Sequence, residues 1–492
     1  MVTVKLIGVF ITNTLTENLQ KLRPELPYLV GILSNNGQRY ASVLVTEDSG
    51  TEIFYTLGRS EKGLTPQSRI DPVNASLGVC LSISDGTTTY SIATNSLDIN
   101  FLARKAREFS SQVDVGIGIP HELVEDSYLD KHWVTETVLD PTKTDKNVVI
   151  GILQRLAEKM INTDVRIVNA RTYHDSRAKH KLFSDNYKTL SQTLYSCSVG
   201  LIPTARDDDQ RIAFRIIQAP GYEVLADLPE DIANELGEEV LLHLGARKIE
   251  PGEYRVILGP RAAGLVAHES FGHGFEADRI VVNSARGGDF IGKRVGSDLV
   301  IIRDFPGIPG KNGSYFFDDQ GVVVEGPTTM VQNGILNEQP LTDMNSFLKL
   351  SKRLNVRRSP NGRVETYDHP VYPRMSNTYF DTDSRGINFD EMCERVDNGV
   401  YLDQGYSGME DPLGWGIQLT FLRGWKIRDG KVTRECFYMP AGTGNVPDLL
   451  QSIDMIGDSL EIGGSARCGK GHKEFVRVSS GGTYISGKLV LA

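Results

Sequence analysis

Alternating apolar and polar positions predict antiparallel β structure for residues 1–95. Two apolar runs within Tyr28–Val45 meet at Asn36-Gly37, and the stretch Leu77–Ala93 repeats this arrangement around Asp85-Gly86. Both dipeptides favour the tight turns that join the strands of a hairpin. We therefore expect two hairpins, each with one buried and one solvated face.

Helical spacing appears in three later segments. Apolar residues three and four positions apart share one face in Ser96–Phe109, in Val148–Ile161 and in residues 232–244. In the first segment this face comprises Ile99, Leu102, Ala103, Ala106 and Phe109. The third segment follows Asp227-Leu228-Pro229-Glu230, which has the composition of a capped helix start, and it should end near Gly245.

Two further segments, residues 164–218 and 290–492, are predicted to be mostly β. Asp164–Gln218 should form strands, and its basic cluster of Arg177, Lys179, His180 and Lys181 should lie in a solvated loop. A strand at Tyr254–Leu258 and a turn at Gly259-Pro260 should lead into a helix that carries His268.

Residues 290–492 contain further strand and turn signals. Asp298–Ile302 is a strand candidate, and Asn333-Gly334 and Asp429-Gly430 should turn hairpins. A helix is expected at Pro447–Ile456, followed by a glycine-rich loop at Gly463–His472.

These segments together predict an α+β protein with two domains. The pattern changes near residues 222–228. We therefore expect a mixed α/β domain over residues 1–225 and a larger β-rich domain over residues 226–492. In the second domain, the helix that carries His268 should pack on antiparallel sheets.

Composition and charge narrow the classes of partner. Apolar residues make up 40% of the chain, charged residues 24%, and the formal net charge is −10. Nonspecific nucleic-acid binding needs a basic surface, so no nucleic-acid partner is expected. No apolar run approaches the ~18 residues of a membrane span, so no membrane partner is expected either.

The cysteines indicate a reducing compartment. Five cysteines are scattered along 492 residues, which does not resemble a disulfide framework. The short apolar stretch Leu6–Ile11 lacks a small-residue cleavage site and is expected to be a first β-strand rather than a signal peptide. The expected location is the cytoplasm.

The candidate chemistry lies in His268-Glu269-Ser270-Phe271-Gly272-His273. Two imidazoles and a carboxylate within six positions can supply the ligands of a zinc ion and a base for its water. Residues five apart on a regular α-helix point about 140° apart, so such a helix does not easily aim both histidines at one ion. We therefore expect a π-type bulge, or a helix end, near Gly272.

A third ligand is needed, because a hydrolytic zinc site usually has three protein ligands and one open position. Glu276, Asp278, another histidine and a distant cysteine are all candidates. Cys468 is the most suggestive cysteine, since its glycine-rich surroundings let the backbone approach a metal; a buried, unreactive thiol is the alternative.

The string HESFGHGFEAD resembles the HExxxH signature of the TldD/PmbA family, zinc metallopeptidases once described as modulators of DNA gyrase. Further blocks resemble the family in the same order: DFPGIPGKNGSYFFDDQG (304–321), VQNGIL (331–336), PRMSNT (373–378) and GSARCGKGHKEFVRVSSGGTYISGKLVL (464–491). Residues 1–75 depart from the family pattern. His472 stands where the family usually has glutamine, which adds a candidate ligand or proton donor beside the alternative of a solvated loop histidine.

The chain keeps both histidines and the glutamate of the motif, so it is similar to the active, TldD-like type of the family. The resemblance implies a zinc ion held by His268, His273 and Cys468. It also implies that Glu269 is the catalytic base, which passes a proton from the zinc-bound water to the leaving amine. Glu276 would then be a hydrogen-bond partner of a ligand histidine, with a surface carboxylate as the alternative.

The resemblance also implies the substrate class and the partner. The substrates would be unfolded or extended peptides, cut with little sequence preference. The chain would form a heterodimer with an inactive PmbA/TldE-like homologue, or a homodimer. Two other functions stay open: a non-catalytic regulatory subunit of the gyrase-modulator type, stabilised by zinc, and a zinc amidase that acts on small metabolites.

Overall fold

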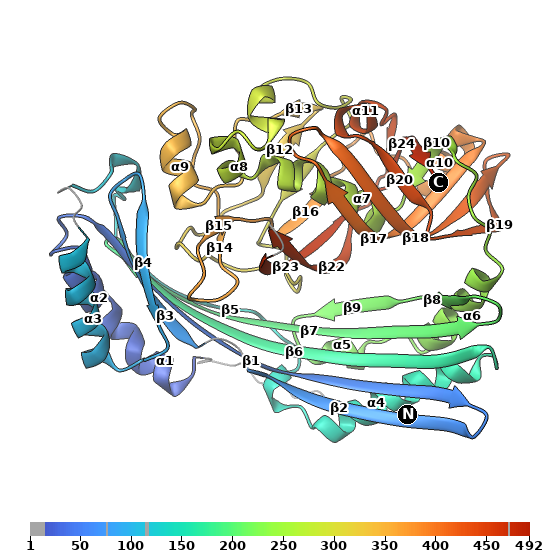
Figure 1. Cartoon of the computed structure of the whole chain (residues 1–492), viewed down its shortest axis with the longest axis horizontal. Coiled ribbons are helices and arrows are strands. Elements are labelled where there is room, and N and C mark those ends of the chain that lie inside the picture. Colours follow the sequence, from blue (N-terminus) through green and yellow to red (C-terminus); the bar gives the residue numbers. More distant parts are fainter. Residues whose placement is uncertain (1–14, 75–76, 114–117, 471–472) are drawn as a thin grey trace.

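The computed structural model describes residues 15–74, 77–113, 118–470 and 473–492. A long N-terminal sheet lies along one side of the molecule, and two C-terminal sheets lie on the other (Figure 1). The strand expected at Leu6–Ile11 and the candidate ligand His472 fall outside the described residues. No helix in the described ranges is long and apolar enough to cross a membrane.

The N-terminal sheet has nine strands within the described residues, in the order β4-β3-β1-β6-β7-β5, with β2 paired to β1 and with β8 and β9 paired to β7. The strands are β1 (Tyr40–Ser60), β2 (Gly63–Asn74), β3 (Gly78–Ser84), β4 (Thr89–Thr94), β5 (Leu129–Val134), β6 (Ile167–Asp185), β7 (Lys188–Arg206), β8 (Gln210–Ile212) and β9 (Arg215–Ala219). Two groups of helices cover its two ends (Figure 1). They are α1 (Glu17–Leu22), α2 (Leu26–Leu33) and α3 (Ile99–Gln112), and α4 (Lys146–Asn162), α5 (Glu223–Ala226) and α6 (Ile232–Leu244).

Two larger sheets build the C-terminal half. Over the described part of the chain, one has seven strands in the order β10-β17-β18-β20-β24-β21, with β19 on β18, and the other has six in the order β13-β12-β11-β16-β23-β22. Helix α7 (Pro260–Ala267) lies between them and packs on β17 of the first sheet and on β22 and β23 of the second. This packing places the start of the histidine motif inside the main hydrophobic core.

The bounds of the remaining elements are as follows. The seven-stranded sheet contains β10 (Gly252–Leu258), β17 (Gly399–Glu410), β18 (Gly416–Arg428), β19 (Lys431–Tyr438), β20 (Ala441–Asn445), β21 (Met455–Ile456) and β24 (Ile485–Leu491). The six-stranded sheet contains β11 (Ile302–Asp304), β12 (Thr328–Gln332), β13 (Ile335–Leu336), β16 (Asn377–Phe380), β22 (Glu461–Lys470) and β23 (Lys473–Gly482). The other strands and α-helices are the short pair β14 (Gly362–Arg363) and β15 (Tyr372–Pro373) and the helices α8 (Ala277–Val281), α9 (Met344–Leu350), α10 (Phe389–Val396) and α11 (Val446–Gln451).

The predicted α+β class is confirmed, and so are several local predictions. Strands β3 and β4 pair around Asp85-Gly86, and the hairpins at Asn333-Gly334 and Asp429-Gly430 are present. Helices α3, α4 and α6 occupy the three segments with helical spacing. Each of the three large sheets also includes a parallel pair (β5–β7, β10–β17 and β16–β23), so the sheets are mixed rather than purely antiparallel.

The hairpin predicted at Tyr28–Val45 is wrong in its first arm, which is helix α2. Its buried residues are Leu26, Leu29, Val30 and Leu33. That spacing is helical, and Pro27 occupies the first turn, where its missing N–H costs nothing. Asn36 and Gly37 have positive φ angles and end this helix before β1, instead of turning a hairpin.

Other boundaries also differ from the prediction. The strand expected at Asp298–Ile302 begins only at Ile302, and the helix expected at Pro447–Ile456 is already over at Gln451. Helix α6 begins at Ile232 after Asp231, whose side chain makes no capping hydrogen bond, so the cap predicted at residues 227–230 is wrong. The glycine-rich segment expected to be a loop is strand β22, because β23 pairs along it.

The basic cluster at residues 177–181 is part of strand β6 and not a solvated loop. Lys181 and His180 are buried, and the ammonium of Lys181 forms a buried ion pair with Asp319 in the C-terminal half. This ion pair joins the N-terminal sheet to the C-terminal half. The sequence did not predict this ion pair, because a strand with several charged residues resembles a solvated segment.

We expect Lys181→Met to lower the free energy of unfolding by about 3–5 kcal/mol, because it leaves the Asp319 carboxylate buried without its cation. Lys179→Met is the matched control, because Lys179 lies on the same strand, 3.8 Å from a partly exposed Asp48, and should cost less than about 1 kcal/mol. Urea denaturation of both variants measures the difference. Equal costs for the two would contradict a structural role for the buried pair.

Candidate metal centre

The histidine motif begins where helix α7 stops being a regular α-helix. Residues His268–Gly272 form a π-helical turn, and the N–H of His273 donates to the carbonyl of His268, five positions earlier. An i→i+5 hydrogen bond places residues five apart above one another. The rings of His268 and His273 accordingly lie with their centroids 5.0 Å apart. The expected distortion near Gly272 is therefore confirmed.

Close packing makes Gly272 necessary at this point. A Cβ on Gly272 would lie 2.1 Å from the sulfur of Met375 and 3.3 Å from the carbonyl oxygen of Ala267. A side chain there would push the π-helical turn away from Met375, which lies in the segment between β15 and β16. The glycine therefore allows the two histidines to face the same point.

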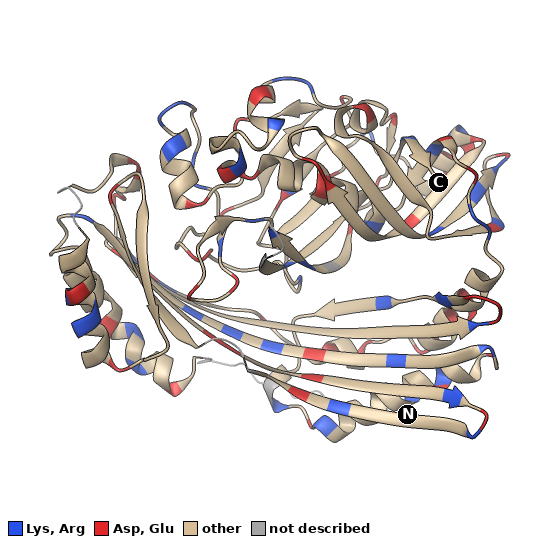
Figure 2. Cartoon of the chain, in the orientation of Figure 1, with Lys and Arg blue, Asp and Glu red and all other residues tan. Residues whose placement is uncertain are grey.

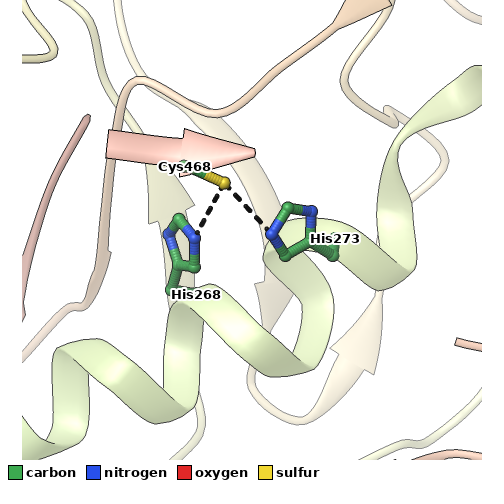
Figure 3. A group of neighbouring side chains, drawn as sticks. All are labelled: His268, His273 and Cys468. Atoms are coloured by element: carbon green, nitrogen blue, oxygen red, sulfur yellow. Dashed lines mark hydrogen bonds between the residues drawn. The ribbon is translucent and has the colours of Figure 1, made fainter. Parts of the chain in front are cut away.

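Cys468 approaches both histidines from strand β22 (Figure 3). Its Sγ lies 3.3 Å from Nε2 of His268 and 3.2 Å from Nε2 of His273. These three ligand atoms all lie within 4.8 Å of one another, and all three residues are buried. The structure thus brings together the three residues that the family resemblance named.

The charges of the three groups stabilise one another. Burial alone would raise the pKa of the Cys468 thiol, but the two imidazoles outweigh it and lower that pKa to about 4. Burial lowers the pKa of both imidazoles, yet Cys468, and at His273 also Glu276, raises them overall. The two imidazoles therefore favour the thiolate, the form of cysteine that binds metals.

A buried carboxylate supports the second histidine. Glu276 is fully buried, and its Oε2 lies 3.4 Å from Nδ1 of His273 and 3.0 Å from Nζ of Lys470. Although burial raises its pKa, Lys470 and His273 hold the pKa of Glu276 well below its usual value. Glu276 is thus not the surface carboxylate considered as the alternative, and it is placed to orient the ring of His273.

The backbone and sulfur of Cys468 are held by an arginine. Nη2 of the fully buried Arg374 donates to Sγ of Cys468 at 3.0 Å and to its carbonyl oxygen at 2.8 Å. The guanidinium also lies 3.4 Å from Glu276. Arg374 therefore connects the thiolate to the carboxylate that supports His273. It lies in the block PRMSNT, but nothing in the sequence indicated this role.

Glu269 is buried beside the histidines. A Cβ on Gly408 would lie 2.5 Å from Cγ of Glu269, so strand β17 runs directly against this side chain and fixes it. Carboxylate oxygens of Glu269 and Glu410 and a ring nitrogen of His273 lie within 4.8 Å of one another. Burial, with a contribution from Glu410, raises the pKa of Glu269, which favours proton uptake. Glu410 had no signal in the sequence.

The other candidate ligands lie apart from this cluster. Asp278 accepts a hydrogen bond from Nζ of Lys470 at 2.8 Å and does not join the three ligand atoms. Cys197, Cys393 and Cys436 are buried elsewhere, and Cys80 is partly buried. His472 lies outside the described residues.

The residues present fit a zinc ion. Zinc prefers thiolate and imidazole ligands in a tetrahedral arrangement, and a catalytic site keeps one position open. Three such ligands converge here. Nδ1 of His273, the ring nitrogen that faces away from Cys468, contacts the carboxylate of Glu276, and ligand histidines in proteins commonly have such a partner.

The chain is similar in sequence to known metallopeptidases. Residues 251–482 match the model of the PmbA/TldA metallopeptidase C-terminal domain. A metalloprotease of Methanocaldococcus jannaschii is 32% identical over 264 residues, 53% of this chain and 55% of that protein. A zinc metalloprotease TldD homolog of Saccharolobus solfataricus is 28% identical over 321 residues, 64% of this chain and 69% of that protein.

Solved structures share the fold over nearly the whole chain. A protein described as a modulator of a DNA gyrase from Thermotoga maritima superposes with a TM-score of 0.70 at 18% identity, covering 96% of this chain and 100% of that chain. TldE from Thermococcus kodakarensis gives a TM-score of 0.67 at 12% identity, covering 96% and 99%. In sequence, the chain spans about half the length of the first curated relatives it matches, 55% and 56%.

Proposed function

We propose that this chain, in which residues 251–482 match the PmbA/TldA metallopeptidase C-terminal domain, is a zinc-dependent peptidase that hydrolyses peptide bonds of unfolded or extended peptides. One observation carries the proposal. The buried ligand atoms of His268, His273 and Cys468 converge, and the carboxylate of Glu269 lies beside them.

Different residues of the chain transfer the proton and orient the metal ligands during hydrolysis. A bound zinc ion would polarise the scissile carbonyl and lower the pKa of water to about 7. Glu269 takes a proton from the attacking water and delivers it to the leaving amine. Strand β17, through Gly408, keeps the carboxylate in place between these two transfers. Glu276 and Arg374 hold His273 and Cys468 in their orientations.

The number of ligands favours catalysis over a purely structural metal. A structural zinc is closed by four protein ligands, whereas a catalytic zinc keeps one position for water or substrate. Three ligands converge in the described part of the chain. This observation disfavours the non-catalytic, gyrase-modulator alternative.

An extended peptide suits the position of Cys468. Among the described residues, strand β22, which carries this residue, is the last strand of its sheet and pairs with β23 on one side. The free edge of a strand can hold a peptide by backbone hydrogen bonds that do not depend on its side chains. This feature supports peptides over the small metabolites of a zinc amidase.

The subunit arrangement, the location and the domain division form part of the proposal. The likeness to TldE supports a heterodimer with an inactive homologue, with a homodimer as the second arrangement. The five unpaired cysteines support a cytoplasmic location. Residues 1–225 would form the N-terminal domain and residues 226–492 the metallopeptidase domain.

Removal of the metal tests the proposed function. The tagged chain, isolated with any subunit that co-purifies, should cleave an unstructured peptide. It should lose this activity in 1,10-phenanthroline and regain it when zinc is restored. Cleavage that persists after the zinc has been removed, as checked by metal analysis, would contradict a zinc-dependent mechanism.

Arg374→Met should weaken zinc binding about 10- to 100-fold, the usual effect of removing a partner of a metal ligand. The substitution removes the two hydrogen bonds that hold Cys468. Arg279→Met is the matched control, because Arg279 lies 3.6 Å from the same Glu276 but makes no contact with the sulfur. Zinc competition with a chromophoric chelator measures the affinity.

The absorption spectrum of the cobalt-substituted protein gives a second readout for this prediction. Loss of the Arg374 hydrogen bond should shift the sulfur-to-cobalt charge-transfer band, and Arg374→Lys should restore part of the shift. If the methionine variant keeps both the wild-type affinity and the wild-type band, Arg374 does not act through Cys468.

A further inference from the structure

A cavity of about 840 Å³ lies between the N-terminal sheet and the C-terminal half. Its walls come from β1, β5, β6 and β7 on one side, and from the segment after β11 and strands β22 and β23 on the other. Figure 2 shows lysine and arginine residues placed along the long strands that pass beneath the C-terminal half. Binding sites for small molecules typically have volumes of about 300–1,000 Å³, so the cavity is large enough for one.

The cavity is separate from the metal centre. Its lining does not include His268, Glu269 or His273, nor Cys468. Arg467 lines it from β22, one position before Cys468, and is paired across the sheet with Arg477, which lines it from β23. Neighbouring residues of a strand point to opposite faces. The side chain of Arg467 therefore points away from the metal centre that Cys468 faces.

Part of the positive charge in the cavity wall is already neutralised. Lys181 pairs with Asp319, and Arg177 and Arg477 both pair with Asp175. These pairs belong to the junction between the two halves of the molecule. They leave little attraction for an added anion.

Three other basic residues of the wall, Lys311, Arg363 and Arg467, form no ion pair within the described residues. Arg363 donates to the carbonyl oxygens of Met375 and Arg477. Lys311 is half-buried, and burial lowers its pKa although the nearby Glu461 raises it. Partial burial of a cation is costly, and a bound anion would reduce that cost.

Aromatic side chains form another part of the wall, which also contains aliphatic and acidic residues. Trp133 stacks on Phe316 with ring centroids 6.2 Å apart and an interplanar angle of 11°. Tyr315 lies beneath two cations, 5.5 Å from Nζ of Lys181 and 5.2 Å from the guanidinium carbon of Arg363. Flat apolar surfaces beside unpaired cations suit a ligand that has both an aromatic body and a negative group.

From these observations we propose that the cavity is a second binding site, for a small organic anion with an aromatic body. The negative group pairs with Lys311 and Arg363, and the aromatic body packs against Trp133 and Phe316. The negative group is a carboxylate or a phosphate. This site does not depend on the proposed peptidase activity.

Fluorescence of 1-anilinonaphthalene-8-sulfonate, an aromatic sulfonate, tests the site in the zinc-loaded full chain. Lys311→Glu should weaken binding of the dye at least tenfold. The matched charge reversal is Lys349→Glu. Lys349 lies on the exposed side of α9, so this variant should bind the dye like wild type. N-acetyl-tryptophan and phenyl phosphate are then added as competitors, and displacement by one or the other identifies the negative group as a carboxylate or a phosphate.

A conservative variant keeps the test valid if Lys311→Glu does not fold. Trp133→Phe should remove most of the energy transfer from tryptophan to the bound dye. Trp425→Phe, in the seven-stranded sheet, should leave it in place. Unchanged dye affinity in Lys311→Glu, unchanged transfer in Trp133→Phe, or failure of both competitors to displace the dye would overturn the proposal.

Discussion

Glu269→Gln should abolish most peptide cleavage while zinc stays bound. Proton transfer by a positioned side chain accelerates a reaction about 10²–10⁴-fold, and we expect a loss of kcat/KM in that range. Glutamine keeps the size of the side chain beneath Gly408 but cannot accept the proton. The ligand trio does not include Glu269, so the zinc content should match that of wild type.

Two other carboxylate variants sharpen this test. Glu461→Gln removes an exposed carboxylate of β22 and should leave cleavage unchanged. Glu410→Gln changes the second carboxylate of the cluster beside His273. If peptide cleavage is lost in Glu410→Gln but not in Glu269→Gln, Glu410 is the general base. Full activity in Glu269→Gln would contradict the proposed mechanism.

Cys468→Ser should reduce zinc affinity by more than the 10- to 100-fold typical of a substituted ligand partner. The substitution replaces a thiolate, which both imidazoles stabilise, by a weakly coordinating hydroxyl. It also leaves Arg374 facing a neutral oxygen. Equilibrium competition with a chromophoric chelator measures the loss, and peptide cleavage should fall with it.

The matched control for this substitution is Cys80→Ser. Cys80 lies on β3, partly buried and 3.7 Å from the hydroxyl of Ser82. Its replacement should leave both zinc affinity and cleavage unchanged. Wild-type zinc affinity in Cys468→Ser would show that the third ligand is another residue.

The histidine motif shows how far local sequence can determine local geometry. A five-residue spacing cannot aim two side chains at one point from a regular α-helix. The spacing therefore predicted a distortion, and the π-helical turn at His268–Gly272 is that distortion. The hairpin around Asp85-Gly86 was predictable for a similar reason, because its turn and its alternation are both local.

The errors had two causes: the ambiguity of a short apolar run, and contacts between residues that are distant in sequence. A short apolar run does not distinguish a buried helix from a strand, and α2 was assigned wrongly on that ground. Lys181 appeared to be solvated because Asp319 lies far along the chain. Cys468 was named through the family resemblance, but β23 makes its segment a strand. Arg374 and Glu410 could not be assigned without the fold.

X-ray absorption at the zinc edge of the purified chain tests the central claim most directly. The account predicts one zinc per chain, with one sulfur at about 2.3 Å and two histidine nitrogens at about 2.0–2.1 Å. The sulfur should be absent from the zinc shell of Cys468→Ser. A zinc shell without sulfur in the wild-type protein, or one that keeps its sulfur in Cys468→Ser, would contradict the proposed metal centre.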